Sequence, residues 1–474
     1  MRGVHGPQLR GAARRATVGG VTSVLWFRRD LRLGDHPALL AAAADGPIVA
    51  LFAFDGALWG PSGDVRRAYL LRSLRALDAD LCVRGGGLLL AHGDPAVEVP
   101  RLAAEAGARE VHISADFGPY GQVRDAAVEA ALAADGRALV RTGSPYAVAP
   151  GRVLKGDGTP YRVYTPYQRA WAAHGWRAPA PSEDADVDWV PAPAEQRWPD
   201  APDLGALALP PAGEQAALTG WDAFRSAGGL TAYADRRDRP DLAGTSALSA
   251  ALRWGEVHPR TLLAELDGSP GAEVFGKELA WREFYADVLF HQPASARASL
   301  RPEMALIRTD TGPEAGARFE AWCAGRTGYP FVDAGMRQLL AEGWMHNRVR
   351  MVVASFLVKD LHLDWTRGAR WFMARLRDGD LASNQQGWQW AAGTGTDAAP
   401  YFRVFNPVTQ GLRFDPDGAY VRRYVPELAG LAGALAHEPW QAPGGLPDAY
   451  PPRLVDHAAE RDEALARYQA VRGR

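Results

Sequence analysis

The chain of 474 residues is too long for one compact core, and its 47% hydrophobic and 23% charged residues are typical of a globular protein. A formal net charge of −2 gives no global argument for nucleic-acid binding, although a local basic patch is enough to bind DNA. Two cysteines exclude a disulfide framework and a thiolate metal cluster, and the longest apolar runs, such as residues 49–54, are too short to cross a membrane. We therefore expect a cytoplasmic protein with no membrane partner.

Residues 1–20 contain four arginines but no apolar segment of signal-peptide length. We expect this stretch to be a disordered arm outside the fold.

Residues 21–150 alternate between short apolar runs and helical patterns, which predicts a parallel, doubly wound, Rossmann-like sheet in an α/β domain. The turn after the first strand reads Arg-Arg-Asp-Leu-Arg over residues 28–32, so a glycine-rich nicotinamide-dinucleotide loop is disfavoured there. The predicted strands are 24–27, 48–54, 88–91, 111–114 and 138–141, and the predicted helices are 37–44, 65–81, 96–106 and 121–134.

Eight prolines between residues 177 and 211 indicate a surface linker, which we place within residues 151–213. Beyond residue 214 the strand pattern disappears, and residues 214–474 are predicted to form an all-α domain. Its clearest helical patterns cover residues 274–290, 334–342, 348–358 and 369–376.

Sixteen tryptophans are unusual, and six of them lie between Trp322 and Trp390. A single tryptophan is most often a buried core residue. These six, however, are interspersed with polar residues at 343–351, at Asp378-Gly379-Asp380 and at Asn384. Buried polar groups require partners, so the pattern favours a bound polar ligand.

Long motifs in this region resemble the flavin domain of the photolyase and cryptochrome family. They read GRTGYPFVDAGMRQL, EGWMHNRVRMVVASFLVKDL and DGDLASNQQGWQWAAGTGTDAAPYFRVFNP, and LWFRRDLRLGDHPAL and GTSALSAALRWGEVHPR match as well. The resemblance covers nearly the whole chain except residues 1–20 and the linker, and it is closest to class I photolyases for cyclobutane pyrimidine dimers.

The resemblance implies FAD, active in its reduced form, inside the helical domain. The turn at 245–249 would hold the phosphates of FAD, and the alternative is that this turn is a plain helix cap. Arg350 should pair with Asp378, and the alternative is that this ion pair has a purely structural role. Asn384 would face the flavin, where a neutral amide suits a reduced, anionic ring. The implied FAD residues are Tyr233, Thr245, Ser246, Ala247, Leu248, Ser249, Glu278, Arg350, Asp378, Gly379, Asp380 and Asn384.

The resemblance also implies light-driven repair of pyrimidine dimers in DNA by electron transfer to a flipped-out dimer. Several arginines would contact DNA phosphates, and for each of them alone the alternative is a solvated surface charge. Acting together, these arginines would make DNA binding salt-sensitive. The implied catalytic residues are Glu278, Asn347, Met351 and Asn384. The implied DNA-binding residues are Arg237, Glu278, Trp281, Arg282, Asn347, Arg348, Trp390 and Arg403.

Photoreduction in the family usually follows three tryptophans, and Trp388 and Trp365 match the inner two. No tryptophan lies in the outer region, residues 307–312, so we hypothesise that Trp371 or Trp322 replaces it or that photoreduction is poor.

The antenna pigment is predicted from other positions. Ala296 stands where folate-binding members have cysteine, and Tyr120-Gly121 replaces their asparagine-glutamate pair. Residues 116–121 look more like members that bind a deazaflavin, so we expect a deazaflavin antenna or none.

Two other classes of protein are alternatives to a repair enzyme. A cryptochrome-type light receptor without repair is the main alternative; the complete dimer pocket, Asn384 and a chain that ends soon after Arg453 argue against it. A nucleotide-handling α/β enzyme would need a phosphate motif after the first strand. We expect the protein to be a monomer. We also expect no metal site, because His346 and His362 beside Asp360 and Asp364 lack convincing ligand spacing.

Overall fold

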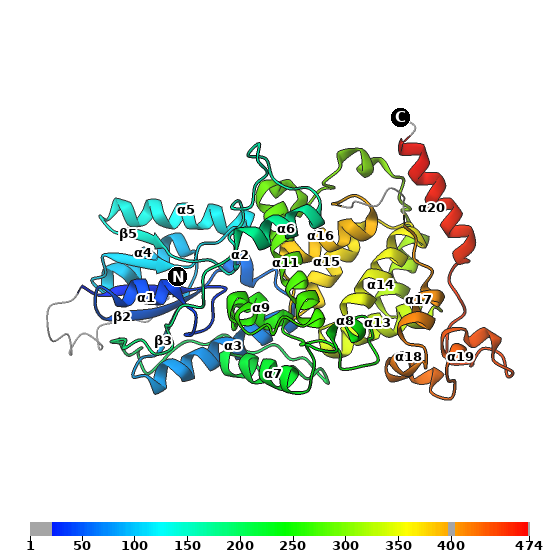
Figure 1. The fold of residues 1–474 in the computed structure, drawn as a ribbon, viewed down its shortest axis with the longest axis horizontal. Coiled ribbons are helices and arrows are strands. Elements are labelled where there is room, and N and C mark those ends of the chain that lie inside the picture. Colours follow the sequence, from blue (N-terminus) through cyan, green and yellow to red (C-terminus); the bar gives the residue numbers. More distant parts are fainter. Residues whose placement is uncertain (1–20, 397–402, 473–474) are drawn as a thin grey trace, which may run out of the picture.

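The computed structural model describes residues 21–396 and 403–472, with a sheet at one end of the long axis and a helical part at the other (Figure 1). The predicted arm, residues 1–20, lies outside the described residues. Among the helices that are described, none has both the length and the apolar character needed to cross a bilayer.

The sheet has five parallel strands in the order β3-β2-β1-β4-β5, which confirms the predicted doubly wound fold. Because the strand order reverses between β1 and β4, the carboxyl ends of these strands flank the point where such sheets bind ligands. The strands are β1 (Ser23–Phe27), β2 (Ile48–Phe54), β3 (Leu88–His92), β4 (Glu110–Ile113) and β5 (Ala138–Arg141).

Helices cover both faces of the sheet because successive strand residues point to opposite sides. Leu25 and Phe27 pack against α1 and α3, whereas Val24 and Trp26 pack against α4 and α5. The four-residue helix α2 was not predicted, since it is too short to show helical periodicity. The helices are α1 (Pro37–Ala43), α2 (Gly56–Trp59), α3 (Asp64–Val83), α4 (Pro95–Glu105) and α5 (Pro119–Ala134).

The described residues after 214 contain helices and no strand, which confirms the all-α prediction. Several helices begin four residues before the predicted start because proline or a capping side chain extends the first turn beyond the apolar pattern. Asp364, for example, accepts a hydrogen bond from Thr366 N at 2.7 Å and so caps α15.

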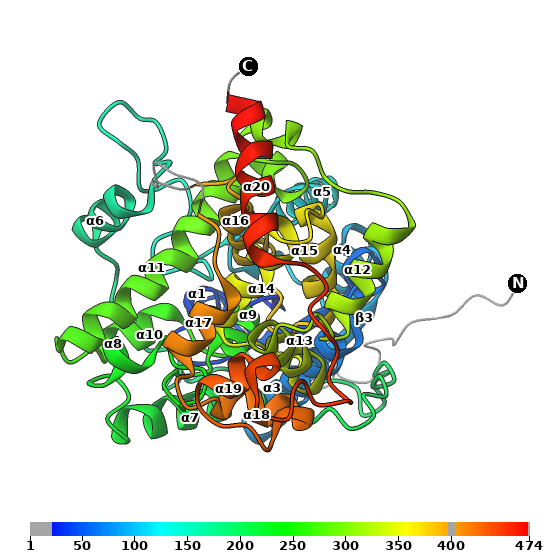
Figure 2. The same ribbon diagram turned by 90° about the vertical axis from the view of Figure 1, so that its right-hand side faces the viewer.

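Figure 2 looks onto this helical end, where α14 lies near the middle and is surrounded by other helices. The longer helices are α7 (Glu214–Ser226), α11 (Pro270–His291), α12 (Pro313–Cys323), α13 (Pro330–Glu342), α14 (Asn347–Lys359), α15 (Trp365–Arg375), α16 (Leu381–Ala392), α17 (Pro407–Phe414) and α20 (His457–Arg472). The shorter ones are α8 (Tyr233–Arg236), α9 (Ser249–Trp254), α10 (Pro259–Ala264), α18 (Ala419–Tyr424) and α19 (Ala434–His437), with 3-10 turns at Pro293–Ala296, Pro302–Leu306, Pro426–Leu428 and Pro439–Gln441.

The region expected to be a linker is more ordered than its composition suggests. It contains α6 (Tyr164–His174), whose Tyr167 and Trp171 are buried in one cluster with Phe284 of α11. Further along, Trp189 is buried beside β2, where Val190 N donates to Ile48 O at 2.8 Å. The proposed domain boundaries at residues 150 and 213 stay predictions.

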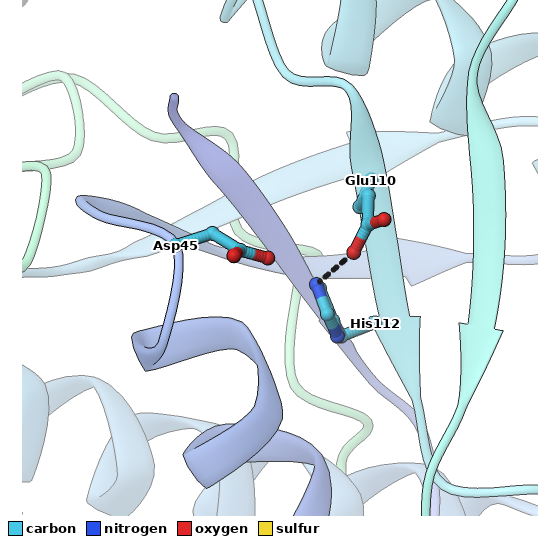
Figure 3. A group of neighbouring side chains, drawn as sticks. All are labelled: Asp45, Glu110 and His112. Atoms are coloured by element: carbon cyan, nitrogen blue, oxygen red, sulfur yellow. Dashed lines mark ion pairs between the residues drawn. The ribbon is translucent and has the colours of Figure 1, made fainter. Parts of the chain in front are cut away.

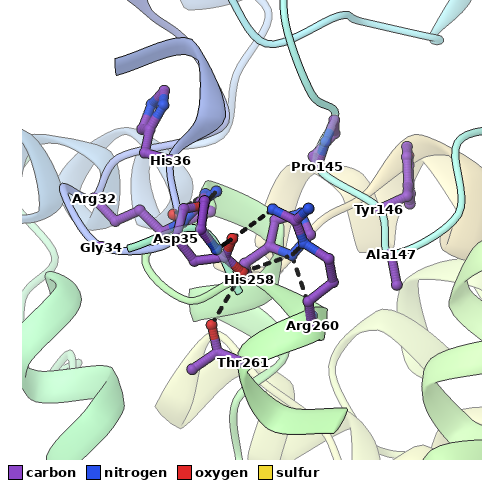
Figure 4. Close-up of polar contacts among 12 residues, drawn as sticks. Arg32, Gly34, Asp35, His36, Pro145, Tyr146, Ala147, His258, Arg260 and Thr261 are labelled. Atoms are coloured by element: carbon purple, nitrogen blue, oxygen red, sulfur yellow. Dashed lines mark hydrogen bonds and ion pairs between the residues drawn. The ribbon is translucent and has the colours of Figure 1, made fainter. Parts of the chain in front are cut away.

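Asp35 joins the two parts of the molecule (Figure 4). Its carboxylate pairs with Arg260 of α10 and accepts hydrogen bonds from Thr261 Oγ1 at 3.2 Å and from Ala180 N at 2.8 Å. Burial, together with the charges of nearby arginines, lowers the pKa of His258 well below its usual value, so this side chain is neutral. These contacts fix the helical part against the carboxyl edge of the sheet.

Candidate active site

Three helices carry ten of the predicted site residues, and α16 packs against both α11 and α14. This packing brings together residues that are more than a hundred positions apart in the sequence. The residues are Glu278, Trp281 and Arg282 on α11, Asn347, Arg348, Arg350 and Met351 on α14, and Asn384, Trp388 and Trp390 on α16.

Arg350 and Asp378 form the ion pair that the sequence suggested. Arg350 Nη2 lies 2.8 Å from Asp378 Oδ2, and Arg350 Nε also donates to Met345 O at 2.7 Å. The other carboxylate oxygen, Asp378 Oδ1, is buried and has no hydrogen-bond partner among the described residues. Since buried oxygens are normally satisfied, Asp378 is suited to accept a hydrogen bond from a ligand.

Asp380 is held from the N-terminal part of the molecule. Its Oδ2 lies 2.7 Å from Arg29 Nη2, in the turn after β1, and its Oδ1 caps α16 by accepting from Ser383 N at 3.0 Å. Burial opposes ionisation of Asp380, but the charges of Arg29 and Arg253 outweigh burial and lower the pKa of the carboxyl. Sequence reasoning missed Arg29, because its motif indicated only the absence of a glycine-rich loop.

Arg253 is a second residue that the sequence did not single out. Its Nε donates to Gly379 O at 3.0 Å, whereas its buried Nη1 has no hydrogen-bond partner among the described residues. Burial and the neighbouring Arg29 lower the pKa of Arg253 to about 9. A buried guanidinium N–H without a partner favours an anionic ligand group. The only sequence signal was the position of Arg253 in the motif GTSALSAALRWGEVHPR, shortly after the turn at 245–249.

The turn at Thr245–Ser249 leads into α9 and is shaped by a close backbone approach. A side chain at Gly244 would overlap Arg236 O, and Ala247 adopts a left-handed conformation with φ of 54°. The described structure has no side-chain cap on α9, so the hydroxyls of Thr245 and Ser246 do not act as an ordinary helix cap. The predicted phosphate role of this turn is untested. Leu248 is buried in the turn, Ser249 Oγ accepts from Trp344 Nε1 at 3.2 Å, and Tyr233 is buried against Phe275.

Asn384 is buried near the start of α16. Its Nδ2 donates to Ala369 O at 3.1 Å and to Gln385 Oε1 at 2.9 Å. With both amide protons used, the carbonyl oxygen is the group that can receive a ligand donor. Asp378 Oδ1 and Arg253 Nη1 are a buried acceptor and a buried cationic donor without partners among the described residues, which fits a ligand such as FAD that carries both ring N–H groups and phosphates.

Glu278 belongs to a chain of charges with the predicted DNA-binding arginines. Arg237 contacts Glu278 directly, and Asp238 links Arg237 to Arg348 through distances of 3.7 Å and 2.8 Å. Burial raises the pKa of Glu278 in spite of the charge of Arg237. Arg237 and Arg348 are therefore paired residues and not isolated surface charges, while Asn347 beside them is exposed.

Trp281 is stacked on a residue from the expected linker. The Tyr164 and Trp281 rings lie 3.6 Å apart between centroids with 8° between their planes. Tyr164 OH donates to Lys277 O at 2.6 Å, which fixes the tyrosine over the indole.

The remaining predicted DNA-binding residues have different surroundings. Arg282 donates to Pro145 O and Leu252 O, both at 3.0 Å, which favours a role in joining the two parts of the molecule. Arg403 lies over the Trp390 ring at 5.9 Å and is exposed, as a phosphate contact requires. Half-buried Met351 lies one helical turn after Asn347. A common opening ringed by Trp281, Met351 and Trp390 stays a prediction.

Two aromatic directions lead away from Trp388. In one, Trp322 lies 6.1 Å from Trp388, Phe319 lies 5.8 Å from Trp322, and half-buried Trp371 lies 6.4 Å from Phe319. In the other, buried Trp365 borders a cavity of about 220 Å³ that is also lined by residues 307–309. The region where an outer tryptophan was expected is thus occupied partly by open space.

The predicted antenna region, residues 116–121, is closely packed. Tyr120 OH donates to Asp55 Oδ2 at 2.5 Å, Asp116 Oδ1 accepts from Gly118 N at 3.0 Å, and a side chain at Gly121 would overlap the Asp116 carboxylate. Ala296, the other position considered, contributes its carbonyl oxygen to Gln385 Nε2 at 2.5 Å.

The histidines considered as metal ligands have other partners. His346 Nδ1 accepts from Arg348 N at 3.2 Å and caps α14, and His362 Nε2 lies 2.7 Å from Glu460 Oε2. Asp360 lies 2.5 Å from His457 Nδ1, and Asp364 caps α15.

Known proteins of one family are similar to this chain over nearly its whole length. Residues 23–185 match the family described as DNA photolyase, and residues 275–470 match the FAD binding domain of DNA photolyase. A deoxyribodipyrimidine photo-lyase of Streptomyces griseus is 44% identical over 95% of this chain and 99% of its own length. The crystal structure of a bacterial class III photolyase from Agrobacterium tumefaciens is 37% identical, covers 98% of this chain and 100% of its own, and superposes with a TM-score of 0.87. A cryptochrome structure from Synechocystis sp. PCC6803 is 27% identical, with a TM-score of 0.83 over 95% of this chain and 100% of its own.

Proposed function

Since the chain belongs to the DNA photolyase family, we propose that it uses light and reduced FAD to split cyclobutane pyrimidine dimers in DNA. The enzyme class is that of the relatives named deoxyribodipyrimidine photo-lyase, and DNA is the substrate. We place the protein in the cytoplasm and expect it to act as a monomer.

The observation that carries the proposal is the environment of Asn384. Both of its amide protons are donated within the protein, so it offers a neutral carbonyl oxygen. A carboxylate at this position would repel an anionic reduced flavin, whereas a neutral acceptor does not. This favours an enzyme that works from the reduced cofactor over a light receptor.

The residues that would hold FAD are Asp378, paired with Arg350, and Arg253 beside the turn at 245–249. When it is bound and excited, reduced FAD supplies the electron that opens the cyclobutane ring. The protein's own contribution is to position the groups and to exclude water.

The α11 side of the site would recognise the flipped-out dimer. Trp281, held in its plane by Tyr164, would provide a stacking surface, and Trp390 would provide a second. Glu278, paired with Arg237, would form a hydrogen bond to the pyrimidine edge of the dimer. Asn347 and Met351 would contact the same dimer from α14, and the exposed Arg403 would contact a phosphate.

We further propose that electrons reach the site from the surface through Trp388 and Trp365, the inner two positions of the family resemblance, with Trp322 or Trp371 in place of the outer tryptophan. The ring contacts that run from Trp388 to Trp322 and then through Phe319 to Trp371, at 6.1, 5.8 and 6.4 Å between centroids, support Trp322 and Trp371 as the candidates for that outer position. For the antenna we keep a deazaflavin or none. The pigment released from native protein would decide this, and a folate would contradict it.

A repair assay tests the function. An oligonucleotide with a single thymine dimer is illuminated with blue light in the presence of purified, reduced protein, and dimer loss is followed by the recovery of absorbance at 260 nm (an ordinary thymine band). We expect light-dependent loss that stops in the dark. Asn384→Asp is the matched variant, since it changes charge at constant size, and we expect slower repair with FAD still bound.

The alternative is a light receptor without repair. The similarity of this chain to a cryptochrome structure is the observation that favours this alternative. Flavin that is bound and reduced, together with dimers that persist under light, would support the receptor and contradict repair.

A further inference from the structure

Asp45, Glu110 and His112 converge at the edge of the sheet that carries the amino ends of the strands (Figure 3). Glu110 and His112 lie two residues apart on β4, so they project from the same face of the sheet. Asp45 comes from the turn between α1 and β2. Ser23 brings this turn near, because its N–H donates to Pro47 O at 2.9 Å and it is the strand partner of Glu110.

His112 has no ordinary explanation as a buried histidine. It is 2% exposed, and neither ring nitrogen has a hydrogen-bond partner among the described residues. Its Nε2 lies 3.2 Å from Glu110 Oε2, a contact that would be an ion pair only if the imidazole were protonated.

The two carboxylates also lack a compensating cation. Within the described part of the chain, neither Asp45 nor Glu110 pairs with a lysine or an arginine. Two carboxylates without a cationic partner therefore lie beside a buried imidazole, and a cation that binds nitrogen as well as oxygen would satisfy all three groups.

The spacing suits such an ion. One ligand atom from each residue lies within 4.8 Å of the others. Two ligand atoms on a tetrahedral zinc ion with bonds of about 2.0–2.2 Å lie about 3.3–3.6 Å apart, close to the contact between His112 and Glu110. The hard cations Mg²⁺ and Ca²⁺ prefer oxygen ligands alone, whereas Zn²⁺ accepts imidazole and carboxylate together.

We propose that Asp45, Glu110 and His112 form a binding site for one divalent transition-metal ion, Zn²⁺, whose fourth ligand is water. The ion would tie the turn after α1 to β4 across β1 and so stabilise the sheet. The site lies on the α1 face at the amino ends of the strands, away from the helical part, and the proposal does not depend on light-driven repair.

Isothermal titration of the chelator-treated full-length protein with ZnCl₂ tests the site, with MgCl₂ as the comparison metal. We expect one Zn²⁺ per chain and no comparable Mg²⁺ binding. Asp45 is exposed, so Asp45→Asn should fold normally and weaken Zn²⁺ binding by about tenfold or more. His112→Asn should weaken it further, and Asp135→Asn, an exposed residue of the same domain, should bind like the unchanged protein.

Thermal unfolding gives a second readout. Zn²⁺ should raise the midpoint of the unchanged protein and of Asp135→Asn but not that of Asp45→Asn. Two results would overturn the proposal: no saturable Zn²⁺ binding, or equal binding by the unchanged protein and both site variants, which would place the ion elsewhere on the chain.

Discussion

The aromatic rings of Tyr164 and Trp281 stack almost in parallel, with their centroids 3.6 Å apart. One residue lies on α6, in a region whose composition suggested a linker, and the other lies on the long helix α11. The contact therefore connects a segment with no predicted functional residue to the surface that we propose for the DNA lesion.

Tyr164→Ala should weaken binding of a dimer-containing oligonucleotide about fivefold, because an aromatic pair is worth about 1 kcal/mol beyond the area it buries. Fluorescence anisotropy of a labelled oligonucleotide measures the change. Tyr164→Phe keeps the stack and loses only the bond to Lys277 O, so it should bind nearly as tightly as the unchanged protein. Equal affinity of Tyr164→Ala and the unchanged protein would show that the stack does not position Trp281.

Removal of Arg350 should destabilise the protein. Arg350→Ala leaves Asp378, whose side chain is 2% exposed, as a buried charge without its partner, and we expect a loss of about 3 kcal/mol in unfolding free energy. Urea unfolding measures it. The double variant Arg350→Ala with Asp378→Asn removes the uncompensated charge and should recover part of the loss; a double variant as unstable as the sum of the single ones would argue against the pair.

Stability should fall on acidification because of His346. Burial lowers the pKa of His346 to about 4 from 6.5, and its Nδ1 must stay unprotonated to accept from Arg348 N. Since the unfolded chain takes up the proton first, the stabilisation is complete above pH 6.5 and is lost as the pH falls towards 4. The full difference corresponds to about 3 kcal/mol.

His346→Asn, which can cap α14 but does not titrate, is the matched control. Urea unfolding between pH 7 and pH 5 should show a smaller decrease for this variant than for the unchanged protein. Identical pH profiles would assign the acid sensitivity to other groups.

The proposed electron route predicts different effects for three tryptophans. Trp365→Phe should strongly slow photoreduction of the bound flavin by an external thiol, and the one of Trp322→Phe and Trp371→Phe that removes the outer residue should slow it as well. Flavin absorbance under continuous blue light measures the rate. An unchanged rate in Trp371→Phe would remove Trp371 from the route, and an unchanged rate in Trp365→Phe would contradict its place as an inner residue.

The layout of the fold could be predicted from the sequence pattern alone. All five strands were located to within one or two residues, and the four clearest helical patterns of the C-terminal half were found, because buried faces repeat every two residues in strands and about every 3.6 in helices. It also pointed to Arg350 and Asp378, since both lie within motifs that can be read locally. Helix starts were less accurate, because caps and first-turn prolines lie outside the apolar pattern.

Which distant groups meet could not be predicted from the sequence and follows from the packing of the elements. Arg29 and Asp380 are 351 positions apart, and no local pattern links an arginine after the first strand with a helix cap in the other half of the chain. The same holds for Tyr164 with Trp281 and for Asp45 with His112. Periodicity reports which face of an element is buried, but the partner on the other side is fixed by how the elements pack, and that packing depends on the whole chain at once.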